Sequence, residues 1–270
     1  MLAEMANWLC GLPPTLATVL AVAIAAALAV GCLLAVHVTI PHRLRSLHND
    51  VAGFMLAIVG VIYAVLLAFI AIAVWQSYTA AGDLVQTEAN LVDDMYRGSV
   101  SLPPDVAKQL RHDLYAYANA VVQREWSQMA TAPPAQLQAW LILDHVHLDL
   151  SELHAVDAQT VAAQTAMFAL LNKLYDARRG RFNAARAGLP VILWWNLLAG
   201  AVILFAFSSL FGTARLAMHA VMMGLLGGSI GLVLMLIVLL NNPYGGQSHV
   251  SLEPFTWLSK ALTMMDYPRP

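Results

Sequence analysis

Charged side chains are scarce in this 270-residue chain. Asp, Glu, Lys and Arg make up 11% of the residues and hydrophobic residues 60%, whereas soluble domains carry about 25% charged residues. Water therefore cannot be the only solvent of this protein. The formal net charge is −2 and there is no long Lys/Arg run, so the basic surface typical of nucleic-acid binding is missing. We predict no nucleic-acid partner.

Cysteines and catalytic motifs are also lacking. The two cysteines, Cys10 and Cys32, cannot build a disulfide framework. The chain contains no HExxH, CxxC, GxSxG, P-loop, Rossmann or kinase signature. We therefore predict no enzymatic activity, no catalytic residue and no cofactor.

One short pattern has the residue types of a metal site. Asp144, His147, Ser151 and His154 recur at steps of three, four and three, which places them on one helical face. Such a face either holds a metal or is simply solvated. Because no cysteine joins these residues and no zinc motif occurs, we predict a solvated face without a metal.

The chain does contain four long apolar runs, arranged as two pairs. The runs are residues 15–39, 51–78, 189–211 and 216–240, between an N-terminal tail, 1–14, and a C-terminal tail, 241–270. Each reaches the roughly 20 residues that cross a bilayer, and none contains Asp, Glu, Lys or Arg. We predict four transmembrane helices forming two antiparallel hairpins.

The second run, 51–78, has two different helical faces. Bulky apolar residues form one stripe and small residues form the other, which lets a neighbouring helix approach closely. The bulky stripe is Phe54, Ile58, Ile62, Val65, Phe69 and Ile72, and the small stripe includes Gly53, Gly60 and Ala64. Either one stripe packs on helices while the other meets lipid, or the bulky stripe lines and gates a pore by dewetting.

The fourth run, 216–240, contains a cluster of glycines. Its members are Gly224, Gly227, Gly228 and Gly231. Glycines on one part of a membrane helix favour close helix contacts. We predict that they serve helix packing.

Residues 79–188 are mostly polar but keep helical periodicity. We expect an extension of the second membrane helix to Leu102, followed by helices over 105–130, 135–152 and 156–187, with breaks at the two Pro-Pro pairs. Strand signals are absent. The fold class is therefore predicted as all-α, a polytopic membrane protein with an extramembrane helical bundle inserted between two hairpins.

Several strings in this chain occur in the order and spacing of one family. They are the apolar string 60–69, then Trp75, Tyr78, Glu88-Ala89, Tyr96-Arg97, Tyr117-Ala118, Glu125-Trp126, Arg178 to Arg181, Leu189-Pro190, Trp194, the string 242–246 and Pro254-Phe255. These strings resemble the bestrophin-like family over most of residues 51–255. The resemblance implies distant kinship to bestrophins, which are pentameric anion channels with paired membrane helices and a cytosolic helical domain between the pairs.

The resemblance also implies partners. They are a lipid bilayer, further copies of this chain, with a pentamer favoured, and small inorganic ions. The family's usual aspartate and phenylalanine around its late proline appear here as Asn242 and Tyr244. A cation site that relied on that carboxylate would therefore be weakened in this chain.

Four arginines precede the third apolar run: Arg178, Arg179, Arg181 and Arg186. They either meet lipid headgroups, attract anions to a pore mouth, or pair with acidic residues such as Glu88. Glu125-Trp126 is likewise either an interface anchor or a buried Trp beside a paired Glu. We assign the arginines to anions or lipid headgroups.

Charge counts nearly cancel between the two sides of the membrane. The hairpin loops hold Arg43, Arg45 and Arg215, and the other side carries Arg97 and the four arginines just described. The resemblance therefore decides the orientation. We predict a bacterial inner-membrane protein with cytosolic termini and a cytosolic helical domain.

Two functions remain open. The first is an oligomeric ion channel for anions, with residues 51–78 lining the pore. The second is a membrane-anchored interaction or stress-signalling scaffold without transport. The lack of ionisable residues at membrane depth argues against a proton-coupled pump, but it does not separate these two functions.

Overall fold

The computed structural model describes residues 11–46, 49–129 and 138–265, and these residues form helices and turns without a strand. The chain divides into two compact units. Unit 1 comprises Met1–Ser77, Gly188–Asn242 and Gly246–Ser248, and unit 2 comprises Tyr78–Ala187, Pro243–Gly245 and His249–Pro270. The predicted all-α class is confirmed.

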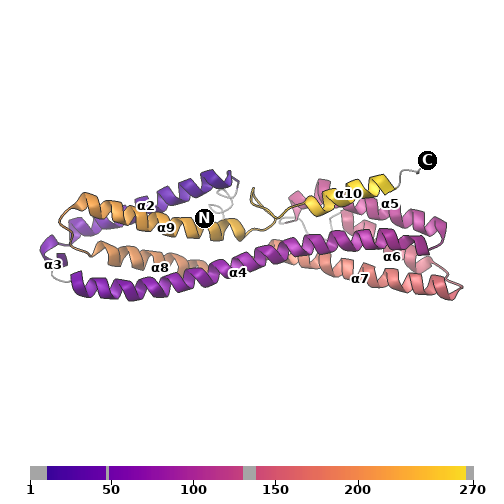
Figure 1. Cartoon of the computed structure of the whole chain (residues 1–270), viewed down its shortest axis with the longest axis horizontal. Coiled ribbons are helices and arrows are strands. Elements are labelled where there is room, and N and C mark those ends of the chain that lie inside the picture. Colours follow the sequence, from indigo (N-terminus) through magenta and orange to yellow (C-terminus); the bar gives the residue numbers. More distant parts are fainter. Residues whose placement is uncertain (1–10, 47–48, 130–137, 266–270) are drawn as a thin grey trace. The chain divides into compact units, whose positions relative to one another are not determined.

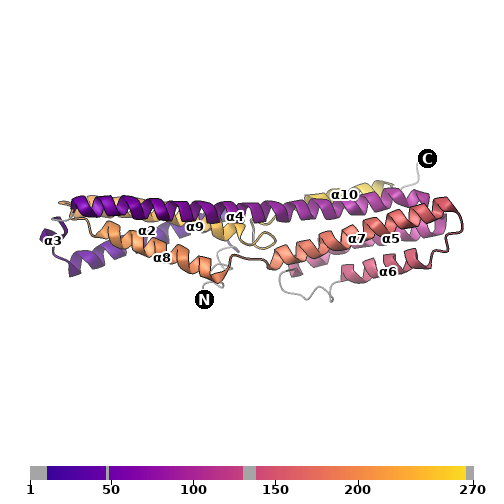
Figure 2. The ribbon, with the colours of Figure 1, turned by 90° about the horizontal axis from the view of Figure 1, so that it is seen from below.

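Unit 1 contains the apolar helices. They are α2 (Pro14–Thr39), α3 (His42–Ser46), the first part of α4 (Asn49–Gly98), α8 (Val191–Ser209) and α9 (Leu216–Leu240). All except α3 belong to segments long and apolar enough to cross a membrane. Both views place α2 alongside α9 (Figures 1 and 2). Pro190 occupies the N-cap position, immediately before the first residue of α8.

Small residues set the distance between α2 and α9. A Cβ added at Gly227 would lie 2.6 Å from the carbonyl oxygen of Ala25, and one added at Gly231 would lie 2.6 Å from Ala25 Cβ. Real Cβ atoms do not approach this closely, so only glycine fits at these positions. A Cβ added at Gly228 would lie 3.3 Å from a methyl of Val22, which is slightly tight. One added at Gly224 would lie 3.8 Å from a methyl of Val30, which is an ordinary contact.

Unit 2 is a helical bundle. It contains the second part of α4, a short turn η1 (Ser99–Ser101), α5 (Pro104–Ala120), α6 (Gln138–Glu152), α7 (Ala158–Arg186) and α10 (Glu253–Met265). Side chains at helical spacing, among them Val85, Val92, Leu114, Leu143 and Leu171, are buried together. The Asp157 carboxylate accepts a hydrogen bond of 2.8 Å from the backbone N–H of Thr160 and so caps α7.

Two segments of unit 2 differ from expectation. The helix predicted over 105–130 ends at Ala120 and continues as a π turn, η2 (Val121–Glu125), and a 3₁₀ turn, η3 (Trp126–Gln128). The tail 241–270, to which we assigned no element, carries α10. Its residues Phe255, Leu258 and Leu262 are buried because their spacing of three and four places them on one helical face. The predicted start of a helix at residue 135 lies outside the described residues.

Candidate functional site

The six bulky residues predicted to line a pore all lie on the outer face of α4 in unit 1. Their exposed fractions in the single chain range from 44% for Ile58 to 69% for Phe54. We call these residues, Phe54, Ile58, Ile62, Val65, Phe69 and Ile72, the α4 stripe. The described residues of unit 1 leave the stripe exposed, and we expect either lipid or another copy of the chain to cover it.

Packing on the opposite face of α4 fixes the rotation of the helix about its own axis. Tyr63 is buried, and its hydroxyl donates a hydrogen bond of 3.0 Å to the carbonyl oxygen of Leu197 on α8. The ring of Tyr63 lies where a Cβ at Gly200 would be, so this glycine makes room for it. Leu67, Ile70 and Val74 continue the buried face. The exposure of the α4 stripe therefore follows from fixed packing.

The small residues predicted on α4 have looser surroundings than those on α9. A Cβ at Gly53 or Gly60 would make ordinary contacts, 3.8 Å from Phe211 and 3.9 Å from Leu204 respectively. Ala64 is exposed and, with Gly60, lines an almost wholly apolar cavity. Within one chain, close backbone packing is thus a property of α9 rather than of α4.

The structure corrects the assignment of the arginine cluster. Arg178 and Arg181 are completely buried in unit 2, so they are not available to lipid headgroups or to anions. Arg179 is exposed and pairs with Asp176 at 3.2 Å. The assignment of Arg179 and Arg186 to anions or headgroups stays a prediction.

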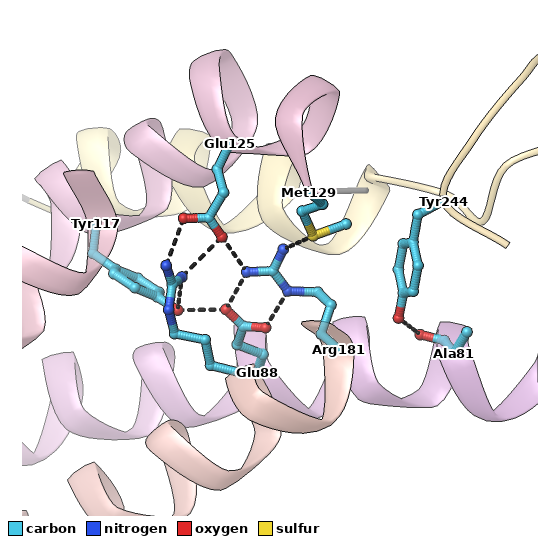
Figure 3. Close-up of polar contacts among 8 residues, drawn as sticks. Ala81, Glu88, Tyr117, Glu125, Met129, Arg181 and Tyr244 are labelled. Carbon is cyan, nitrogen blue, oxygen red and sulfur yellow. Dashed lines mark hydrogen bonds and ion pairs between the residues drawn. The ribbon is translucent and has the colours of Figure 1, made fainter. Parts of the chain in front are cut away.

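The two buried arginines belong to an ionic cluster formed by three elements, α4, η2 and α7 (Figure 3). Arg181 on α7 holds Glu88 on α4 through two hydrogen bonds, Nε to Oε2 at 2.5 Å and Nη2 to Oε1 at 2.9 Å. Arg178 holds Glu125 in η2 by a second bidentate pair, at 2.9 and 2.6 Å. Arg181 Nη2 also reaches Glu125 at 2.7 Å. The cluster of two carboxylates and two guanidiniums is electrically balanced.

Aromatic residues complete the cluster. The Tyr117 hydroxyl donates to Glu88 and accepts from Arg178, and the Arg178 guanidinium lies 4.9 Å from the ring centre of Trp140. Burial and then the charge of Glu88 raise the pKa of Tyr117, so the phenol stays protonated. Burial alone would lower the pKa of Arg181, but Glu88 and Glu125 outweigh it and raise that pKa.

This arrangement is suited to structure rather than to chemistry. Every charge in the cluster has a counter-charge, and both carboxylates and both guanidiniums are buried away from water. The π turn gives Glu125 its place opposite both arginines. The sequence analysis included ion pairing as one alternative for Glu88 and for Glu125. It could not tell which arginine pairs with which glutamate.

Two further predicted positions have structural roles. Tyr244 is buried in unit 2, where its hydroxyl donates a hydrogen bond of 2.8 Å to the carbonyl oxygen of Ala81 (Figure 3), and its ring meets Trp126 edge-on. Asp144, from the weak metal pattern, accepts a hydrogen bond from Tyr175 at 3.4 Å. In the part of the chain that the structure describes, no three His, Cys, Asp or Glu side chains gather around a common point.

Comparison with known proteins identifies the architecture. The sequence-family model of the bestrophin-like domain matches residues 23–255 of this chain. The chain belongs to the bestrophin-like family. With four segments apolar enough to span a bilayer, it is an integral membrane protein. None of the curated proteins matches it.

Solved structures show the same fold. A mutant of a bacterial bestrophin homologue from Klebsiella pneumoniae superposes with a TM-score of 0.67 at 14% identity, covering 92% of this chain and 99% of that one. A second mutant of the homologue gives 0.67 at 15%, covering 90% and 98%. A structure described as a mutant membrane protein gives 0.65 at 13%, covering 94% and 99%. At such identities the likeness extends to the fold alone.

Proposed function

We propose that this protein is an oligomeric, anion-conducting channel whose pore is lined by α4. The observation that carries the proposal is the α4 stripe, a row of bulky apolar side chains exposed along one membrane helix in a chain of the bestrophin-like family. A row of such side chains, repeated around an axis, narrows a path and gates it by dewetting.

The proposal requires several copies of the chain. We expect four membrane helices packed through small residues to have little room for a conduit of their own, and the stripe faces outward from unit 1. Five copies, as in bestrophins, are the expected number. Exposed apolar residues also occur on the other helices, such as Val202 on α8 at 63% and Leu225 on α9 at 68%, and we assign these surfaces to lipid or to subunit contacts.

The test is ion flux through purified protein in liposomes, with chloride and potassium measured separately against protein-free vesicles. Chloride-selective flux is expected. Absence of flux of both ions from folded, inserted protein would refute the channel and favour the scaffold, in which the membrane helices only anchor and oligomerise unit 2. A monomer in mild detergent would also count against the channel.

We further propose that unit 2 and both termini are cytosolic, in a bacterial inner membrane. Single cysteines introduced at Asn49 and Ser101 lie on opposite sides of the membrane in this topology. In intact cells, a membrane-impermeant thiol reagent is expected to label position 49 and not position 101. External labelling at 101 would reverse the orientation.

A further inference from the structure

Unit 2 contains a cavity whose charged lining is positive. The cavity lies where η1 passes into α5 and has a volume of about 560 Å³, which is within the usual range of small-molecule sites. Among the described residues that line it there is no Asp or Glu. The lining residues are Val100, Leu102, Pro104, Ala107, Lys108, Arg111 and His112.

Arg111 is held in place on one side of its guanidinium. Its Nε donates a hydrogen bond of 2.7 Å to the Ser99 hydroxyl, and that hydroxyl donates one of 2.7 Å to the carbonyl oxygen of Tyr96. The guanidinium also lies 5.4 Å from the centre of the Tyr96 ring. Within the described part of the chain, neither Nη group of Arg111 has a hydrogen bond or an ion pair. Arg111 is therefore an oriented fork with its outer donors available.

Two further cationic side chains stand beside Arg111. Lys108 and His112 are exposed and lie three residues before it and one residue after it, so the three side chains lie close together on α5. Within the described residues Lys108 has no ion pair. Asp113 does not line the cavity; it is buried and accepts hydrogen bonds from Gln109 at 3.3 and 3.2 Å.

Like charges at this spacing destabilise a helix, and a bound anion removes the repulsion. Part of the cavity wall is apolar, because Leu102 and Ala107 line it and are each 6% exposed. A ligand that fits both features carries negative charge at one end and an apolar group at the other. A phosphomonoester brings a charge of about −1.5 to −2 at pH 7, and its oxygens match the arginine fork.

We propose that this cavity binds a small organic phosphomonoester. Arg111 and Lys108 bind the phosphoryl oxygens, His112 lies at the same end, and Leu102 and Ala107 contact the apolar group. The phosphoryl group comes from a soluble molecule or from a lipid headgroup of the same chemistry. The site is separate from the α4 stripe and does not depend on the proposed channel activity.

The test measures binding instead of flux. Phenyl phosphate is titrated into full-length protein in phosphatidylcholine nanodiscs and followed by calorimetry, at about 0.15 M salt to screen unspecific attraction. Wild type is expected to bind phenyl phosphate at least tenfold more tightly than inorganic phosphate, and not to bind phenol. Failure to bind phenyl phosphate would overturn the proposal, and so would equal affinity for phenol.

Substitutions locate the binding. Lys108→Gln and Arg111→Gln are each expected to weaken phenyl phosphate binding about tenfold, since each removes a hydrogen bond to a charged group. Lys173→Gln is the matched control, because Lys173 is an exposed lysine on α7 outside the cavity, and its affinity is expected to equal that of wild type. Equal affinities in Lys108→Gln and wild type would overturn the site. This arm holds even if Arg111→Gln does not fold, because Lys108 is exposed.

Competition by lipids distinguishes the two sources of the phosphoryl group. Phosphatidic acid, a phosphomonoester, is added to the nanodiscs, and phosphatidylglycerol, an anionic phosphodiester, serves as its control. A phenyl phosphate affinity that falls with phosphatidic acid alone supports a lipid headgroup as the ligand. An affinity that neither lipid changes supports a soluble ligand. An equal fall with both lipids would overturn the preference for a phosphomonoester.

Discussion

The two units of this protein differ in how much charge they bury and in how closely their helices approach one another. Unit 1 joins α2 to α9 through glycines and alanines and has almost no acidic residues, whereas unit 2 buries two Glu–Arg pairs at its centre. In a bilayer, hydrophobic burial does not drive helices together, because lipid is as apolar as the helices. Van der Waals packing between closely approaching backbones stabilises their contact instead. In water, an apolar core supplies the driving force, and a paired ionic cluster can specify how the helices meet.

The largest expected effect comes from breaking the ionic cluster. Arg181→Met leaves two buried carboxylates short of partners and is expected to cost about 3–5 kcal/mol of unfolding free energy. Urea titration of the solubilised chain, followed by tryptophan fluorescence, measures this loss. Arg179→Met is the control, because Arg179 lies two residues away with its side chain 61% exposed, and it is expected to stay within about 0.5 kcal/mol of wild type. Equal losses would refute the role given to the cluster.

The matching change in unit 1 adds one methyl group. Gly227→Ala places a Cβ against α2 and is expected to cost about 1–3 kcal/mol by overpacking. Gly224→Ala adds the same group where its Cβ meets only Val30, at 3.8 Å, so little change is expected. Thermal unfolding in detergent compares the two variants. If both behave alike, the glycines of α9 are not what sets the α2–α9 distance.

Shortening a side chain of the α4 stripe tests whether this surface of unit 1 controls ion flux. Phe69→Ala is expected to raise basal ion flux about fivefold, equivalent to about 1 kcal/mol in the barrier, because the change widens the proposed constriction. Val202→Ala removes an exposed apolar side chain from α8 and is expected to leave flux unchanged. Liposome flux decides between these outcomes, and unchanged flux in Phe69→Ala would remove this residue from the gate.

The smallest effect concerns the cap of α7 in unit 2. Hydrogen bonds from the Thr160 side chain and backbone lower the pKa of Asp157 below its usual 3.8. Because the folded-state pKa is the lower one, the charged cap stabilises fully above pH 3.8, and this stabilisation is lost as the pH falls through the folded value. Asp157→Ala is therefore expected to melt below wild type at pH 7, with a gap that closes in acid.

Asp157→Asn provides the control for this cap. It keeps a side-chain acceptor that does not titrate, so its melting temperature is expected to lack the acid step attributed to Asp157. A gap between wild type and Asp157→Ala that is constant from pH 7 to pH 3 would contradict the assignment.

The membrane helices could be predicted from the sequence because their signal is local. An apolar run such as 216–240 needs no knowledge of its neighbours to be placed in a bilayer, and α9 has those same bounds. The arginine cluster could not be placed in this way. Arg181 follows Glu88 by 93 positions and Glu125 by 56, and nothing in the local sequence distinguishes it from the exposed Arg179 two residues earlier.

Helix α10 lies between these cases. The spacing of Phe255, Leu258 and Leu262 is a local signal for an amphipathic helix. A short amphipathic helix in a tail is stable only when its apolar face packs against a hydrophobic core. The π turn at Val121–Glu125 had no local signal that we recognised. It places Glu125 opposite two arginines of α7, which lie more than 50 positions later in the chain.

The sequence by itself determined that this chain is an all-α membrane protein with two apolar hairpins and a polar helical insert, because hydropathy and helical periodicity depend on near neighbours. Only the tertiary structure decided which charges are buried together, which glycines touch another backbone, and which face of α4 stays uncovered. These features depend on residues far apart in the chain, and the free energy of a buried charge or a close contact depends on the partner that folding brings to it.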